Sequence, residues 1–263
     1  MLKNTIITLY IITMIMIILI LSGCDGCDIS LNLGKGKAIV NGVLLKHKRT
    51  IHLEEACTQP MIKLEIGSGD INIFGYTQDI ISLDIVILEK EPNDANVYLK
   101  DNLLKTESIG HHPVYIDSIG GYLPENISLT LSAGSGDIYV KNFNSSPKIS
   151  VSTGSGDNEI QDCANIEKLI AEMGSGDILI KNLTNLKYLS TDSGSGDVWV
   201  KNSTIIDAEL ETGSGDIEIR NTEFDSIDAE TGSGDIILNN STYKDGRFDT
   251  GSGNVRTISG SLI

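Results

Sequence analysis

One short motif, Gly-Ser-Gly-Asp, recurs along the sequence and carries side chains that can do chemistry. Copies begin at residues 67, 134, 154, 174, 194, 213 and 232, and an eighth copy at residue 251 ends in Asn. A serine between glycines could act as a nucleophile, and a row of carboxylates could bind Ca²⁺. An active site is rarely built eight times, and the sequence contains neither a Gly-x-Ser-x-Gly elbow nor a His-Glu-x-x-His motif. We therefore expect a protein that is not an enzyme.

The spacing of the motif indicates how these side chains are positioned. From residue 134 onward, successive copies begin 20, 20, 20, 19, 19 and 19 residues apart, a period typical of solenoids. Each Asp is followed by alternating residues such as Ile138-Tyr139-Val140, which is the period of a half-buried strand. A second short strand precedes each motif copy. The sequence predicts an all-β fold, a single-stranded β-solenoid (β-helix) of about 19–20-residue coils.

Stacked coils lie about 4.8 Å apart and bring equivalent residues into columns. The acidic corner column comprises Asp137, Asp157, Asp177, Asp197, Asp216 and Asp235. The amide column comprises Asn142, Asn182, Asn202, Asn221 and Asn240. We expect both columns to be structural, with each carboxylate accepting backbone N–H groups of its own Gly corner. The alternative is a row of weak Ca²⁺ sites between coils, although each coil supplies only one corner carboxylate. No other cofactor is expected.

The charge balance narrows the range of partners. The chain has 20 Lys and Arg against 36 Asp and Glu, for a formal charge of −16. Such a chain repels phosphate backbones, so we do not expect it to bind nucleic acid. Hydrophobic residues make up 40% of the chain, which is enough for a packed core.

The N-terminus has the features of a bacterial export signal. An apolar stretch from Thr5 to Leu21 precedes Leu21-Ser22-Gly23-Cys24, which resembles a lipobox. In that motif the cysteine is diacylated and becomes the first residue of the mature chain. The sequence therefore predicts a lipoprotein signal peptide over residues 1–23, with lipidation of Cys24. The alternative is an uncleaved membrane anchor, and both interpretations place the rest of the chain outside the cytoplasmic membrane.

The remaining chain divides into three segments. Residues 24–36 are expected to be the lipidated cysteine and a tether, and residues 37–130 an N-terminal cap with irregular wide coils. Residues 131–263 are expected to form the regular repeats. Cys27, Cys57 and Cys163 remain after lipidation, and one pair of them could form a disulfide.

The repeats also resemble a known family. Leu123-Pro124-Glu125-Asn126-Ile127 leads into the first tandem copy, and Gly-Ser-Gly-Asp-Ile-x-Ile then recurs. Together they resemble the bacterial β-strand-repeat family named "putative adhesin", over roughly residues 62–258. The resemblance implies a β-solenoid at the surface or in the periplasm, with a non-catalytic role.

These observations favour a non-enzymatic, lipid-anchored envelope or surface protein that acts as an adhesin or protein-interaction module. Its expected partners are the membrane, through the lipid, and a protein or glycan of unknown identity. The alternatives are an envelope-stress or signalling accessory protein and a carbohydrate-active β-helix enzyme. Against the enzyme, the outward positions show no cluster of catalytic carboxylates. Among them, Tyr139 and Trp199 could form a stacking platform or could be isolated aromatics on a sheet. The sequence leaves inner and outer membrane undecided.

Overall fold

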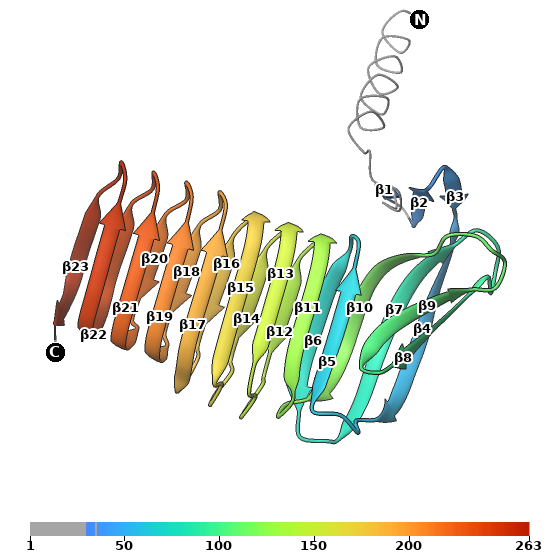
Figure 1. Cartoon of the computed structure of the whole chain (residues 1–263), viewed down its shortest axis with the longest axis horizontal. Coiled ribbons are helices and arrows are strands. Elements are labelled where there is room, and N and C mark those ends of the chain that lie inside the picture. The colour runs from blue at the N-terminus through green and yellow to red at the C-terminus, as the bar shows by residue number, and fades with distance from the viewer. Residues whose placement is uncertain (1–29, 35, 263) are drawn as a thin grey trace, which may run out of the picture.

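A computed structural model describes residues 30–34 and 36–262, which form 23 β-strands. Figure 1 shows the strands stacked side by side from a cap at one end to β23 at the other. Among these residues, no helix has the length and apolar character that crossing a bilayer requires. The prediction of an all-β solenoid is confirmed. Cys24, Cys27 and the predicted signal peptide lie outside the described residues.

The solenoid has two walls of parallel strands, and each coil contributes one strand to each wall. The first wall contains the strands that precede the Gly-Ser-Gly corners. In order they are β5 (Met61–Ile66), β11 (Ser128–Ser135), β13 (Ile149–Ser155), β15 (Lys168–Ser175), β17 (Leu186–Ser193), β19 (Thr204–Thr212), β21 (Glu223–Thr231) and the second half of β22 (Ile236–Thr250).

The second wall contains the strands that follow the corners. In order they are β6 (Asp70–Tyr76), β12 (Ile138–Lys141), β14 (Asn158–Gln161), β16 (Ile178–Lys181), β18 (Val198–Lys201), β20 (Ile217–Arg220), the first half of β22 and β23 (Val255–Leu262).

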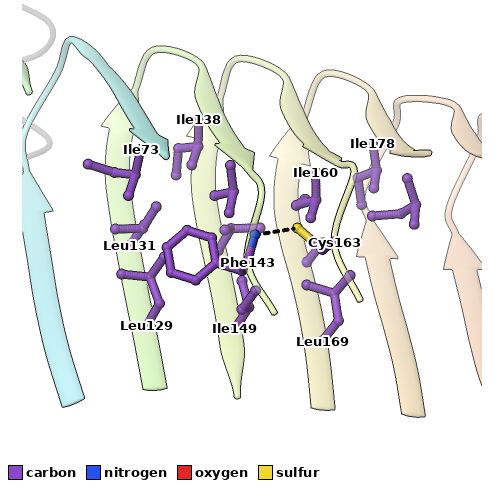
Figure 2. Close-up of a cluster of buried hydrophobic side chains, with 14 of the residues drawn as sticks. Ile73, Leu129, Leu131, Ile138, Phe143, Ile149, Ile160, Cys163, Leu169 and Ile178 are labelled. Atoms are coloured by element: carbon purple, nitrogen blue, oxygen red, sulfur yellow. Dashed lines mark hydrogen bonds between the residues drawn. The ribbon is translucent and has the colours of Figure 1, made fainter. Parts of the chain in front are cut away.

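The core lies between the walls because the strands alternate inward apolar and outward polar residues. Leu129 and Leu131 of the first wall are at most 1% exposed, as are Ile138 and Val140 of the second wall. Figure 2 shows Leu129, Leu131 and Ile138 pointing into one shared interior with Phe143. Full burial of such a side chain stabilises the fold by about 1.5–3 kcal/mol relative to exposure. Asn158 places a fully buried polar side chain at an inward position of the second wall, where the neighbouring coils have an apolar residue.

The change from 20- to 19-residue coils falls in a bend. Lys181 pairs with Lys201, 20 residues later, whereas Leu186 pairs with Ile205, 19 residues later. The missing residue therefore lies between these pairs and outside both walls. A deletion inside a strand would turn its apolar side chains outward, so the strand frame has to be kept.

The cap combines β4 (His47–Ala56), which precedes the first motif copy, with strands from the long segment between the first two copies, which begin 67 residues apart. In the cap, β7 (Ile80–Glu89) pairs antiparallel with both β4 and β10 (Tyr115–Pro124). Strand β10 also pairs parallel with β6, so β4, β7 and β10 extend the second wall beyond the first coil. As a result, β5 and β6 stack directly on β11 and β12, although residues 77–127 separate them in sequence.

Two smaller elements complete the described fold. The hairpin β8 (Ala95–Lys100) and β9 (Leu103–Ser108) joins the first wall by one pairing, Lys63 with Leu103.

A separate antiparallel sheet contains β1 (Ser30–Gly34), β2 (Lys37–Val40) and β3 (Val43–Leu45). Its buried residues Ala38, Val40 and Leu45 pack with Leu88 and Tyr115 of the cap.

Candidate functional site

The corner aspartates form a continuous hydrogen-bonded column. The Oδ1 atom of each accepts the backbone N–H of the equivalent residue in the next coil, with N···O distances of 2.7–3.0 Å. The column contains Asp70, Asp137, Asp157, Asp177, Asp197, Asp216, Asp235 and Asn254. The donor is therefore in the neighbouring coil and not, as the sequence suggested, in the same corner. Parallel in-register stacking directs each N–H toward the preceding carboxylate.

At the end of this column, Asn254 bonds Asp235 through both its backbone N–H and its side-chain amide, at 2.8 and 3.2 Å. These bonds, with the charge of Arg256 at 3.3 Å, lower the pKa of Asp235. In the described part of the chain, the corner column included, no three His, Cys, Asp or Glu side chains are grouped as ligands for a metal ion. Calcium binding by the corner column stays a prediction that the geometry does not test.

The amide column forms a second ladder. The side-chain N–H of Asn182 bonds Asp162 at 2.7 Å, and Asn202, Asn221 and Asn240 each bond the preceding member at 2.9–3.2 Å. All members, including Asn142, have φ between 49° and 63°. Asn and Asp adopt this left-handed conformation more readily than other non-glycine residues, which explains the residue type at this bend. The bond from Asn182, together with Lys141 at 3.0 Å, lowers the pKa of Asp162.

A buried column beside the amide ladder, polar in four of its six positions, was missed from the sequence. Its members are Phe143, Cys163, Leu183, Ser203, Thr222 and Ser241, each at most 3% exposed. Where the residue carries a thiol or hydroxyl, that group donates to the carbonyl two residues earlier, as Cys163 does to Gln161 at 3.2 Å. The sulfur of Cys163 also accepts the N–H of Phe143 at 3.4 Å. Each member of this column directly follows an Asn or Asp of the amide column, so the column could have been identified from the sequence.

The two walls carry different charges on their outer faces. On the first wall, one acidic residue per coil lines up in the acidic row: Glu172, Asp192, Glu211, Glu230 and Asp249. Four of these residues line an open recess of about 470 Å³ together with the glycines of the corners. Arg247 of the last coil pairs with Asp228, Glu230 and Asp249, which neutralises part of this face.

On the second wall, the last residue of each strand points outward and most are basic. The basic row consists of Lys141, Lys181, Lys201 and Arg220, with Gln161 between the first two. The Nζ atom of Lys201 lies 5.1 Å from the ring centroid of Trp199, which is within the range of a cation–π contact. Arg220 pairs with Glu218. Sequence reasoning considered only the neighbouring outward position and therefore missed this row.

The basic row ends in an aromatic cluster where the solenoid meets the cap. Phe74 lies 5.7 Å from both Tyr122 and Tyr139 between ring centroids, and Tyr76 lies 5.6 Å from Tyr122. Tyr122 is 51% exposed. The cluster joins β6, β10 and β12, which lie far apart in sequence, so no local pattern could reveal it. Tyr139 and Trp199 themselves lie three coils apart, separated by Glu159 and Leu179.

This chain is a β-solenoid repeat protein. It has two walls of stacked parallel strands, corners that are hydrogen-bonded from coil to coil, and a cap at one end. A model of the family described as Toastrack DUF4097 matches residues 89–260, so the chain belongs to this family. The resemblance to β-strand-repeat adhesins is thereby confirmed at the level of the family. No curated protein matches the sequence.

Two solved structures share the fold. A protein from Bacteroides fragilis NCTC 9343 described as a "putative adhesin" aligns with a TM-score of 0.52 and 19% identity, covering 80% of this chain and 97% of its own. A protein from Parabacteroides distasonis ATCC 8503 described as a "putative lipid binding protein" aligns with a TM-score of 0.52 and 20% identity, covering 85% and 98%. At these identities the likeness shows the fold alone.

Proposed function

We propose that this chain is a non-enzymatic, lipid-anchored protein of the bacterial cell envelope whose solenoid presents its outer faces to a partner. Anchoring would occur through acyl chains on Cys24, and the partner would be a protein or a glycan at the surface. The adhesin description of a structural neighbour supports this role, as does the lipobox-like sequence before Cys24.

One observation carries the proposal. The polar residues that recur in every coil are used within the fold, because the corner aspartates and the bend asparagines bond from coil to coil. Other outward positions vary from coil to coil, as Tyr139, Glu159, Leu179 and Trp199 do, and the outward charged rows differ in sign between the two walls. Residue types that are constant in the columns and variable on the outer faces are typical of a repeat scaffold that presents a binding surface.

The location is tested by treating intact cells with a protease and following the full-length chain. We expect the wild-type chain to be cleaved while a periplasmic marker is protected. The Cys24→Ala variant should appear in the soluble fraction, whereas Cys27→Ala, the matched control, should stay with the membrane. Protection equal to that of the periplasmic marker would overturn the adhesin role, and membrane retention of Cys24→Ala would overturn the lipid anchor.

A further inference from the structure

The outer face of the second wall carries a basic row on an acidic protein, next to a mixed row that includes Glu159 and Glu218. Lys141, Lys181, Lys201 and Arg220 lie on one line along it, in a chain whose formal charge is −16. Within this row Lys141 pairs with Asp162 and Arg220 with Glu218, whereas in the described part of the chain no carboxylate lies within 4.0 Å of Lys181 or Lys201. The charge of Lys181 still acts on Asp162 at longer range. The two walls of a sandwich lie about 10 Å apart, so the acidic row of the first wall is farther from this face than the bases are. A ligand on this face therefore meets the bases more strongly than the acidic row behind them.

The aromatic cluster continues the same line. Across the strands, Lys141 pairs with Phe74, Phe74 with Tyr122 and Tyr122 with Ser82. Beside Tyr122, a recess of about 270 Å³ is lined by Glu54, Tyr76, Gln78, Ile80 and Ser82. The face therefore combines flat aromatic rings, polar hydrogen-bonding groups and a row of cations.

These three features correspond to three parts of one kind of ligand. The C–H face of a sugar ring packs on aromatic rings, and its hydroxyl groups bond carboxylate, amide and hydroxyl side chains. Sugar carboxylates form charge-assisted hydrogen bonds with Lys and Arg. Lys181, Lys201 and Arg220 recur with the coil spacing of about 4.8 Å, which is of the order of one sugar unit in an extended chain, and Gln161 separates them from Lys141.

We propose that this face binds a linear acidic polysaccharide of the uronic-acid type, with sugar rings on the aromatic cluster and carboxylates along the basic row. This inference rests on the proposed function and specifies its ligand and its surface. A second copy of the chain, bound through its acidic row, is the competing occupant. Its net charge of −16 opposes that association, and it gives no role to the recess beside Tyr122.

The chain carries its own reporter, since Trp199 is the only tryptophan and contacts Lys201. Full-length protein in a non-ionic detergent is titrated with polygalacturonate in calcium-free buffer, following Trp199 emission and, independently, mobility in a gel containing the polymer. Fully methyl-esterified polygalacturonate, which keeps the sugar backbone without the charge, is the matched ligand. We expect binding to the acidic polymer that weakens with added salt, and at least tenfold weaker binding to the ester.

The variant Lys181→Gln/Lys201→Gln should weaken binding at least tenfold, judged from the titration midpoint because Lys201 touches the reporter. The control Lys148→Gln/Lys168→Gln removes the same charge at the first wall, because Lys148 directly precedes β13 and Lys168 begins β15. It also removes a cation–π contact, Lys168 over Tyr188 at 4.9 Å. It should change the midpoint less than twofold. Tyr122→Ala should weaken binding severalfold without changing its salt dependence. Thermal melts verify that each variant is folded.

Three results would overturn the inference. They are equal binding of the ester, equal loss in both double variants, and no binding by either readout. Self-association that Lys181→Gln/Lys201→Gln abolishes, seen by sedimentation equilibrium without polymer binding, would assign the face to a second copy. None of these results bears on cleavage of the chain at the surface of intact cells, so the proposed function is tested separately.

Discussion

The Oδ1 atom of Asp137 accepts the backbone N–H of Asp157, one coil further along the stack, at 2.8 Å. Two carboxylates at the coil spacing repel each other by about 1 kcal/mol in water, and more where water is partly excluded. A hydrogen bond to a charged acceptor contributes about 1.5–3 kcal/mol. The bond thus offsets the repulsion, which explains how consecutive coils can each place an acid at the same corner.

Two substitutions of one corner aspartate should distinguish the effect of its charge on stability from the effect of its hydrogen bond. Asp177→Ala removes the acceptor of the Asp197 N–H, bonded at 2.8 Å, and should lower the free energy of unfolding by about 1–2 kcal/mol. Asp177→Asn keeps an acceptor and removes one repulsive charge, so its stability should match or exceed that of the wild type. Asn254 occupies the equivalent place in the last coil. Urea unfolding followed by circular dichroism measures the stability of both variants. Equal losses of unfolding free energy in the two variants would contradict the role of the carboxylate as an acceptor for the next coil.

Chelation tests whether the corner column also binds Ca²⁺. Because backbone N–H groups already occupy one oxygen of each corner carboxylate, we expect the same melting temperature with and without a chelator. A fall of several degrees that added Ca²⁺ reverses would establish the calcium alternative.

The period of the repeats was sufficient to predict the walls, because a strand frame read from Ile138-Tyr139-Val140 repeats in every coil. The cap could not be predicted in this way. Strands β7 and β10 acquire their neighbours from segments distant in sequence, and β6 lies between β10 and β12 although β7, β8 and β9 intervene along the chain. Long-range pairings of this kind depend on tertiary packing and leave no local period.

Glycine is required at the corners because the backbone of the preceding coil lies too close for a side chain. A Cβ added at Gly154 would lie 2.4 Å from the carbonyl oxygen of Gly134, whereas one added at Gly67, the first corner of the stack, meets nothing within 4 Å. Gly154→Ala should therefore cost about 1–3 kcal/mol, while the matched Gly67→Ala should be nearly neutral. Denaturant unfolding compares them. Equal losses would show that the restriction arises in the corner itself and not in the stacking.

The acid in the amide column should give stability a dependence on pH. The pKa of Asp162 is lowered by the amide of Asn182 and by Lys141. Its contribution is therefore fully present above the unfolded-state pKa, near 4, and is lost as the pH falls through the lower folded-state value. Asp162→Asn should show a smaller fall in melting temperature between pH 5 and pH 2.5 than the wild type. Asp207→Asn, an exposed change on the first wall, is the control, and an unchanged slope in Asp162→Asn would refute the assignment.

The candidate binding face shows the same limit on sequence reasoning. Lys181 and Lys201 end consecutive strands of the second wall, so their alignment follows from the repeat once both outward positions are considered. Tyr122 joins them only because β10 of the cap pairs with β6. The basic row was thus accessible from the sequence, and the aromatic cluster was not.

Cys163 should behave as a structural thiol. Burial raises its pKa to about 12, so at pH 8 it is almost wholly protonated and shielded from alkylating reagents. Cys57 is free and partly exposed, and its thiol donates to the carbonyl of Gln59 at 3.3 Å. Iodoacetamide followed by peptide mapping should label Cys57 within minutes and Cys163 only after unfolding.

Substitution distinguishes the hydrogen bonds of Cys163 from simple filling of the core. Figure 2 shows its sulfur directed at the N–H of Phe143 in the preceding coil. Cys163→Ser should keep this bond, as Ser203 does with the N–H of Leu183 at 3.0 Å, and should cost less than about 1 kcal/mol. Cys163→Val leaves the buried N–H of Phe143 without that acceptor and should cost about 1–3 kcal/mol. If valine were the better tolerated of the two, the column would be held by apolar packing, and the thiol would serve only as a small hydrophobic group.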